Sequence, residues 1–334
     1  MRKLATIRLI EEVLPIEGAD AIEKVRIGGW WVVARKNEFK PGDKCVYFEI
    51  DSLLPPLPQY AFLEKAGKKK TLFEGRDYEG YRIKTIKLRG QISQGLALPV
   101  ASFPGIPDEL GADVSEKIGV VKYEAPVPVD LSGEVKGAIP GFIPKTDEER
   151  IQNSLELLEK CRGQRFYVTE KVDGTSTTFF KYDGQFGVCS RNLEILENES
   201  NVFWNMARSH KLPENLPDGY AVQGEAVGQK IQSNPLKING QKCLVFYVVD
   251  LKKQEYLPLP EMKAFVEKLG MEMVPVFNDN FILDQSYDQL LKIADMKSVY
   301  NPNVNAEGLV FRLYDSRIKV TFKVISNQYL LKQE

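Results

Sequence analysis

The sequence has few of the residues that build metal centres and disulfide frameworks. It contains one histidine, His210, and four cysteines that form no C-x-x-C pair: Cys45, Cys161, Cys189 and Cys243. A single histidine cannot anchor a histidine-based metal site, and scattered cysteines argue against both a zinc site and a disulfide framework. We therefore expect the protein to work in a reducing compartment.

Long hydrophobic runs are absent as well. The best apolar stretch, Leu244–Val249, is far too short to cross a membrane. Arg2 and Lys3 are followed by Glu11 and Glu12, which interrupt the apolar core that a signal peptide needs. These absences predict a soluble, cytoplasmic protein without a membrane partner, and we expect it to be a monomer.

The chain also lacks an excess of charge of either sign. Its formal net charge is −1 over 334 residues, so any nucleic-acid surface must be a local patch. The length suggests two domains, each able to bury its own core.

Residues 1–125 read as short strands separated by glycine and proline, such as Trp30–Ala34, Cys45–Ile50 and Tyr81–Leu88. This pattern is typical of a small β-barrel. The stretch also concentrates basic residues, namely Lys68–Lys70 and Arg82, Lys84, Lys87 and Arg89, with Phe73, Tyr78 and Tyr81 between them. Basic residues interleaved with aromatics suit a nucleic-acid groove, whereas the alternative is a solvated strand face.

Proline and glycine mark residues 126–145 as a linker, and a second domain is expected over residues 146–334. Thr146–Glu149 has the pattern of a capping box that opens a helix reaching Cys161. Further helices are expected at 201–209, 260–269 and 286–297, and strands at 220–225, 244–250, 309–313 and 318–324. Strands with irregularly interspersed helices indicate an α+β fold.

The segment around Lys171 carries the strongest chemical signal. Phe166–Thr169 reads as a strand, and Lys171, Asp173 and Gly174 follow it. A lysine at a strand end can act as a nucleophile when its amine is unprotonated. The same K-x-D-G pattern begins at Lys181, but that copy lies between two strand-like runs, so its Asp-Gly pair reads as a hairpin turn.

Four later stretches place polar residues at strand ends or along one strand face. Arg191 follows the predicted hairpin, Glu225 closes a strand, and Glu307-Gly308 opens another. In the last strand, alternation puts Lys319, Thr321 and Lys323 on one face. Each stretch alone is also compatible with a turn or a solvated edge strand.

In this order, the stretches resemble the nucleotidyltransferase motifs of the covalent ligase and capping-enzyme superfamily. Lys171 resembles motif I, Arg191 motif Ia, Glu225 motif III, Val245–Asp250 motif IIIa, Glu307 motif IV and Thr321–Lys323 motif V. The segments 1–7, 48–52, 88–95 and 142–150 extend the resemblance to the ATP-dependent RNA ligases of the Deinococcus/Naegleria type. It implies an N-terminal OB-fold barrel followed by an adenylyltransferase domain, ATP-grasp-like, with antiparallel sheets plus helices.

The resemblance also implies a chemistry. Lys171 would attack the α-phosphorus of ATP to give lysyl–AMP, AMP would pass to a 5′-phosphate of RNA or DNA, and an RNA 3′-hydroxyl would displace it. Mg²⁺ or Mn²⁺ would be held by Asp173, Glu225 and Glu307, directly or through its waters. Lys323 would neutralise the α-phosphate, Arg191 would contact ribose or the 5′-phosphate, and Glu170 and Gly174 would line the adenosine site.

Two positions depart from the family pattern. Motif V usually reads K-x-K, but Thr321 or Ile325 stands where one lysine is expected, and Lys319 is the nearest substitute. In motif IIIa, Val249 stands where many relatives have an aromatic residue stacked on adenine.

Other readings share part of this pattern. A DNA ligase or a capping guanylyltransferase would use the same first step, but both typically carry an OB domain after motif V, and eleven residues follow Lys323 here. A non-catalytic OB-fold binder would account for the basic barrel and leave Lys171, Glu225 and Glu307 unexplained.

Overall fold

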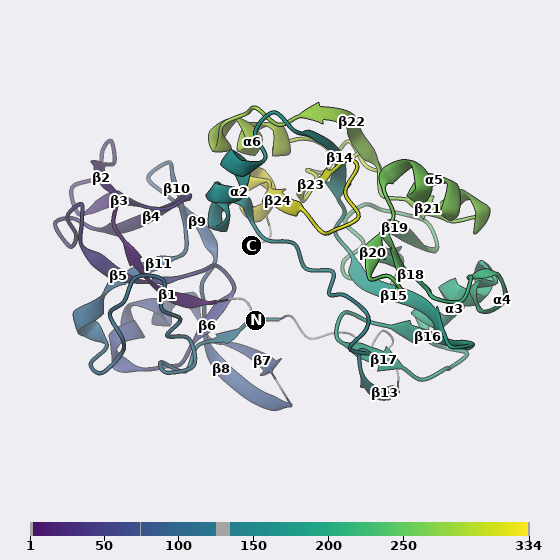
Figure 1. The fold of residues 1–334 in the computed structure, drawn as a ribbon. Helices are drawn as coiled ribbons and strands as arrows, with labels where there is room; N and C mark the ends of the chain where they lie inside the picture. Colours follow the sequence, from purple (N-terminus) through teal and green to yellow (C-terminus); the bar gives the residue numbers. More distant parts are fainter. Residues whose placement is uncertain (1–2, 74, 125–133, 333–334) are drawn as a thin grey trace. The chain divides into compact units, whose positions relative to one another are not determined.

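The computed structural model describes residues 3–73, 75–124 and 134–332 (Figure 1). The chain divides into two compact units, 1–126 and 127–334, called here the N-terminal and C-terminal units. The first part of the predicted linker, residues 126–133, lies outside the described residues. None of the described helices is long and apolar enough to span a membrane.

The N-terminal unit consists of short antiparallel strands, as the sequence pattern predicts. They are β1 (Ala5–Leu9), β2 (Glu12–Pro15), β3 (Ile22–Ile27), β4 (Trp30–Arg35), β5 (Lys44–Phe48), β6 (Ser52–Leu54), β7 (Lys69–Phe73), β8 (Arg76–Arg82), β9 (Thr85–Leu88), β10 (Gln91–Gln94), β11 (Leu96–Pro99) and β12 (Val121–Lys122). Two 3₁₀ helices, Pro58–Ala66 and Val100–Ser102, connect them. The strand orders are β1-β5-β11, β2-β3-β4, β9-β10 and β12-β6-β8-β7.

The predicted single strand over Tyr81–Leu88 is wrong. β8 ends at Arg82, because Ile83 exchanges backbone hydrogen bonds with the Asp51-Ser52 turn instead of continuing the ladder. β9 starts at Thr85 and pairs with β10 across a turn in which Arg89 and Gly90 both have positive φ, 48° and 82°.

The C-terminal unit contains two sheets and several short helices. The larger sheet has the order β13-β17-β16-β15-β18-β19-β20, with β21 parallel to β19. Its strands are β13 (Val135–Ala138), β15 (Thr175–Tyr182), β16 (Gln185–Cys189), β17 (Leu193–Ile195), β18 (Tyr220–Gly228), β19 (Gln241–Asp250), β20 (Glu255–Tyr256) and β21 (Glu272–Met273). The smaller sheet has the order β22-β14-β23-β24, formed by Val276–Ile282, Arg165–Lys171, Gly308–Leu313 and Thr321–Ile325.

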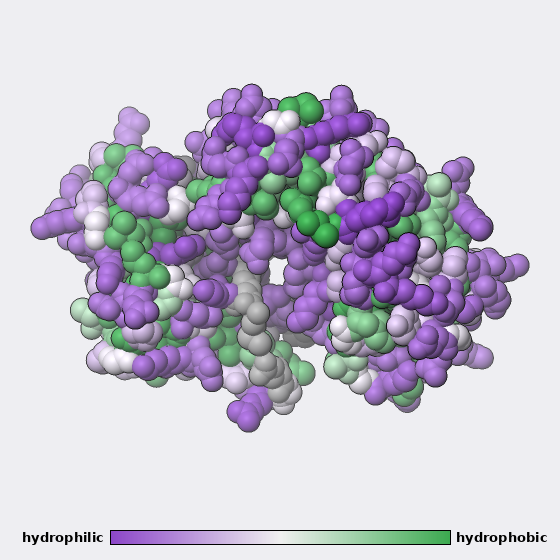
Figure 2. All heavy atoms as spheres, viewed as in Figure 1, coloured by the Kyte–Doolittle hydropathy of each residue, from purple (hydrophilic) through white to green (hydrophobic). Residues whose placement is uncertain are grey.

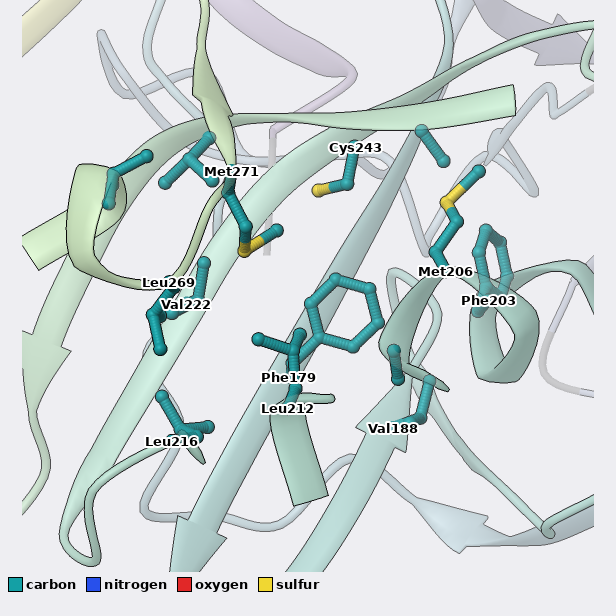
Figure 3. Packing of buried hydrophobic residues seen from close by; sticks show 14 of the residues in the cluster. Phe179, Val188, Phe203, Met206, Leu212, Leu216, Val222, Cys243, Leu269 and Met271 are labelled. Atoms are coloured by element: carbon teal, nitrogen blue, oxygen red, sulfur yellow. The ribbon is translucent and has the colours of Figure 1, made fainter. Parts of the chain in front are cut away.

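Helices cover one face of the larger sheet. Phe179 of β15 and Val222 of β18 are cross-strand partners, both fully buried, and they pack in a cluster with residues of three helices (Figure 3). These helices are α3 (Val202–Ser209), α4 (Leu212–Asn215) and α5 (Leu259–Lys268). Asn201 accepts hydrogen bonds from two backbone N–H groups at the start of α3, which confirms the predicted helix.

The smaller sheet separates an apolar face from a polar one. Phe166, Phe311 and Phe322, on neighbouring strands, are fully buried in a cluster with α2 (Leu155–Lys160) and α6 (Tyr287–Ala294). The predicted cap is confirmed, because Ser286 and Gln289 form a complete capping box. Since strand side chains alternate, Lys171 and Lys323 lie on the opposite, polar face.

The helix predicted to begin at Thr146–Glu149 does not form there. A 3₁₀ helix, Ile151–Asn153, is followed by the short α2, and neither has a side-chain cap. The polar side chains of residues 146–148 instead bond to other parts of the unit, so they do not cap a helix. We call Thr146–Glu149 the strap.

The final helix, α7 (Asn327–Leu330), directly follows β24. Hydrophilic side chains dominate the molecular face seen in Figure 2, and hydrophobic ones gather only in small groups.

Candidate active site

Lys171 is the last residue of β14 and is paired across the ladder with Gly308, the first residue of β23. Its Nζ donates a hydrogen bond to Glu307 Oε2 at 2.7 Å. The side chains are 25% and 18% exposed, so the ion pair is largely withdrawn from water. Lys181, by contrast, donates to the carbonyl of Pro213, and Asp183-Gly184 forms the predicted hairpin turn.

The charge around Lys171 fixes the protonation of its amine. Burial lowers the pKa of Lys171, but the carboxylates of Glu307, Glu225 and Asp173 outweigh burial and raise it. In the ligand-free protein the amine is therefore an ammonium, which is not a nucleophile. Positive charge brought in with a substrate is needed before this amine can lose its proton.

Two carboxyl groups of the site resist ionisation. Burial and the neighbouring Glu307 raise the pKa of Asp173 to about 6, although Tyr329 and Lys171 oppose this. Burial raises the pKa of Glu225 to about 8, with Lys171 opposing it and the other carboxylates adding to it. The ligand-free site therefore holds more negative groups than one lysine can neutralise.

Gly174 and Gly308 allow these groups to approach one another. A Cβ at Gly174 would lie 2.3 Å from the carbonyl oxygen of Ala226, next to Glu225 in β18. A Cβ at Gly308 would lie 2.2 Å from the carbonyl oxygen of Val324 in β24. Both distances are far below contact distance, so the two glycines are required by close backbone packing and not only by turn formation.

The donor set suits a hydrated divalent cation better than a directly ligated one. In residues 3–73, 75–124 and 134–332, no three His, Cys, Asp or Glu side chains converge closely enough to ligate one ion together. Mg²⁺ usually keeps several of its waters, and carboxylates can hold it through them. Asp173, Glu225 and Glu307, which interact electrostatically around Lys171, fit this second arrangement.

Lys323 lies on the polar face of β24 and provides a second amine. Burial, the ammonium of Lys171 and the guanidinium of Arg150 together lower the pKa of Lys323 to about 7. Its backbone N–H donates to the carbonyl of Glu149, which ties β24 to the strap. An anionic phosphate near Lys323 would restore its charge.

The strap crosses this face and bonds to both sheets. Thr146 Oγ1 lies 3.0 Å from Ser176 Oγ of β15, Asp147 pairs with Arg191, and Glu148 accepts a hydrogen bond from Thr321. Arg191, 39% exposed, is thus brought to the strap, and its charge also opposes the raised pKa of Glu225.

The predicted start of the last strand at residue 318 is wrong, because β24 begins only at Thr321 and Lys319 lies in the segment before it. Lys319 Nζ instead donates to the carbonyls of Lys145 and Asp147, at 3.1 and 2.8 Å. It lies 3.4 Å from Glu148 Oε1. Lys319 therefore holds the strap in place, and Thr321, in the position of the missing lysine, does the same through its hydroxyl.

Glu170 lies in β14 directly before Lys171 and is buried. It is 1% exposed, and its Oε2 accepts a hydrogen bond from the backbone of Val299 at 2.9 Å. Burial raises its pKa, opposed by Ser298 and Val299. The other oxygen, Oε1, has no hydrogen-bond partner in the described parts of the chain, so a buried acceptor remains available.

Comparisons with known proteins identify the family. An OB-fold domain model matches residues 4–100, and an RNA ligase model matches residues 164–325. A Naegleria gruberi RNA ligase solved with PPi is 42% identical, with a TM-score of 0.90 over 99% of this chain and 98% of that one. The chain belongs to the RNA ligase family.

Further solved structures agree. An apo mutant of the Naegleria gruberi ligase is 42% identical with a TM-score of 0.90, covering 98% of this chain and 97% of that one. Another mutant, with ATP and Mn, is equally similar over 98% of both chains. No curated protein matches the sequence of the chain. The predicted ATP-dependent RNA ligase, with an OB-fold preceding the ligase domain, is thereby confirmed over the DNA ligase, capping-enzyme and non-catalytic alternatives.

Val249 and the basic residues of the N-terminal unit are the remaining predicted site residues of the ligase. Val249 is fully buried in an apolar cluster with Ile143, so it presents no open surface to a base. In the N-terminal unit, Arg82 bonds to Asp51 at 2.7 Å and lies over the ring of Tyr123. Lys84 follows β8, and Lys87 and Arg89 lie on the β9–β10 hairpin.

The sequence analysis did not identify Tyr329, a residue that contacts Asp173. The hydroxyl of Tyr329, in α7, donates to Asp173 Oδ2 at 2.6 Å. Next to it, Ser326 N–H donates to the carbonyl of Glu307. α7 therefore contacts two of the three carboxylate-bearing residues, and nothing in its short polar sequence signals this.

The raised pKa of Glu225 predicts a pH-dependent stability of the ligand-free ligase. A carboxyl whose pKa is about 8 in the folded state and about 4.5 unfolded stabilises the fold at low pH. That contribution is lost as the pH rises from about 4.5 through 8. Glu225→Gln should therefore gain stability relative to wild type between pH 5 and pH 8.5, by at least about 1.4 kcal/mol.

The measurement is chemical denaturation of both proteins at the two pH values, in the presence of a chelator. Glu214→Gln, at an exposed position of α4, is the matched control. If Glu225→Gln changes the free energy of unfolding equally at both pH values, the raised pKa of the buried Glu225 carboxyl is contradicted.

Proposed function

We propose that this ligase joins an RNA 3′-hydroxyl end to a 5′-phosphate end through lysyl–AMP at Lys171, in nick sealing and RNA repair. The observation that carries this proposal is the Lys171–Glu307 ion pair among three carboxylates, beside Lys323. The 5′-phosphate strand is RNA or DNA. We further propose that the enzyme acts as a monomer in the cytoplasm, which its four free, buried cysteines support.

In the first step, Lys171 Nζ forms a bond to the α-phosphorus of ATP and pyrophosphate leaves with the bonding electrons. Relatives in this family have been solved with ATP and Mn, or with AMP and Mn. A divalent cation, Mg²⁺ or Mn²⁺, supplies positive charge that favours a neutral amine and stabilises phosphoryl charge. Asp173, Glu225 and Glu307 are the residues that would hold it.

In the second step, an oxygen of the RNA 5′-phosphate attacks the phosphorus of lysyl–AMP and releases the Lys171 amine. In the third, the 3′-hydroxyl attacks the activated 5′-phosphorus, and AMP leaves. Lys323 neutralises phosphate charge in these steps, and Arg191, once released from Asp147, contacts ribose or the 5′-phosphate.

The adenosine of ATP would meet the residues next to the nucleophile. Glu170 offers a buried acceptor for adenine N–H groups, and Gly174 keeps the loop close to β18. Val249, at the position where many relatives stack an aromatic residue on adenine, is buried in one cluster with Ile143.

The nucleophile is tested by two lysine substitutions. Lys171→Arg keeps a positive charge near Glu307 but removes the nucleophilic amine, so it should abolish label transfer from radioactive ATP to the protein on a denaturing gel. Lys181→Ala removes only a hydrogen bond to a carbonyl and should label nearly as wild type. Labelling that persists in Lys171→Arg and disappears in Lys181→Ala would contradict the assignment.

The metal role is tested by Glu225→Gln and Glu307→Gln. Each removes one negative charge at nearly constant shape, so each should weaken Mn²⁺-dependent self-adenylylation at least about tenfold. The rise in thermal midpoint that Mn²⁺ causes should shrink in parallel. Glu272→Gln, which removes one exposed carboxylate charge beside Lys242 and Tyr300, is the control. A double variant that adenylylates and responds to Mn²⁺ like wild type would rule out this role.

Nucleic-acid binding by the N-terminal unit is tested at Arg82, Lys84, Lys87 and Arg89. Replacing the three residues other than Arg82 by alanine should leave lysyl–AMP formation intact and weaken nick sealing. Each lost phosphate contact should reduce the salt dependence of binding by about one unit of slope. Arg82→Ala is measured separately, because it also breaks the bond to Asp51. Equal sealing by all variants at limiting substrate would favour a solvated face.

A further inference from the structure

The hairpin of β7 and β8 in the N-terminal unit carries Lys69, Phe73 and Tyr78, which the sequence pattern includes in a nucleic-acid groove and the tests above leave out. The two strands pair from Lys69 opposite Gly80 to Phe73 opposite Arg76. β7 is the outer strand of its sheet, so one of its edges has no neighbouring strand in the described ladder. Thr71, which shares a face with Lys69 and Phe73, is 3% exposed and exchanges hydrogen bonds with the backbone of Glu124, so that face is covered at its centre and exposed at its two ends.

The register sorts the side chains of this hairpin by charge. Residues opposite one another in an antiparallel pair share a face, and successive residues alternate. Lys69, Phe73, Arg76 and Tyr78 therefore lie on one face, called here the cationic aromatic face. The carboxylates of Asp77 and Glu79 fall on the other face, with Lys70 and Leu72.

The cationic aromatic face has the parts of a stacking platform. The rings of Phe73 and Tyr78 lie 6.3 Å apart, nearly perpendicular at 74°, and both side chains are only half-buried. Lys69 and Arg76 are exposed, and neither has an ion-pair partner among the residues that the structure describes. The face thus carries two cations without an ion-pair partner among the described residues and two partly exposed rings.

A protective role for edge-strand lysines is the plain alternative. Lysines on an edge strand discourage aggregation, and this reading accounts for Lys69 and Lys70 equally. It does not account for the aromatic pair, because exposed rings at a sheet margin promote association. Among the described residues of the hairpin, it also does not account for the position of Asp77 and Glu79, which both lie on the face opposite the rings.

We propose that the cationic aromatic face binds unpaired nucleotides of the RNA substrate, with bases stacked on Phe73 and Tyr78 and phosphates next to Lys69 and Arg76. Cations beside aromatic rings are the combination by which proteins bind single strands without reading sequence. The inference rests on the proposed function for the identity of the nucleic acid. It adds a contact surface distinct from Arg82, Lys84, Lys87 and Arg89, and it specifies unpaired RNA.

The test measures binding of a fluorescent single-stranded RNA with a 5′-phosphate, by anisotropy over a series of salt concentrations. Lys69→Ala with Arg76→Ala should reduce the salt slope by about 1.4, the value for two phosphate contacts on a single strand. Phe73→Leu with Tyr78→Leu should lower affinity at least about fivefold and leave the slope unchanged. Phe73→Leu alone is the milder variant if the pair is unstable.

The opposite face of the same hairpin supplies the matched control. Lys70→Ala with Leu72→Ala removes one cation and one apolar side chain, Leu72 being 66% exposed, and should change affinity and slope less than either test variant. On a blunt RNA duplex the ring variant should bind like wild type, because paired bases cannot stack on the rings.

Three results would overturn the inference: wild-type binding by both test variants, equal loss in the control, or equal loss by the ring variant on the duplex. Self-adenylylation of wild type separates this test from the proposed function. If wild type forms no lysyl–AMP adduct, the proposed function is contradicted. If the adduct forms normally and the variants bind RNA like wild type, only the proposed role of the hairpin is contradicted.

Discussion

The ion pair between Lys171 and Glu307 joins two neighbouring strands of the smaller sheet at the point where β23 begins. Alternation along these strands buries phenylalanines on one side and sets Lys171 and Lys323 on the other. The apolar side fixes the sheet, and the polar side can therefore hold charges that are poorly compensated. The arrangement costs stability in the ligand-free protein, as is common where a site is shaped for a charged substrate.

The charges around the site shift the pKa values of Lys171 and Lys323 in opposite directions. Glu307, Glu225 and Asp173 raise the pKa of Lys171, while burial, Lys171 and Arg150 lower the pKa of Lys323 to about 7. A bound nucleotide with its cation would reverse both conditions, because positive charge near the carboxyl groups would favour a neutral Lys171 and a phosphate would restore the charge of Lys323. The strap connects β24 to Arg191 through Asp147.

The sequence was sufficient where local pattern and tertiary structure agree. The strand before Lys171, the hairpin at Asp183-Gly184 and the cap at Ser286 follow from periodicity and turn chemistry. The strap failed as a capping box because Glu148 and Asp147 bond to Thr321 and Arg191, which no local pattern reveals. Tyr329 was missed for the same reason, since its partner lies 156 positions earlier in the chain.

The most direct test of this account is the location of the AMP adduct. Wild-type enzyme is incubated with ATP and Mn²⁺, digested under conditions that preserve the phosphoramidate, and the modified peptide is sequenced by mass spectrometry. The account predicts a single AMP on the peptide that contains Lys171, lost when Glu307 is replaced by glutamine. An adduct on the peptide that contains Lys181, or on Lys323, would contradict it.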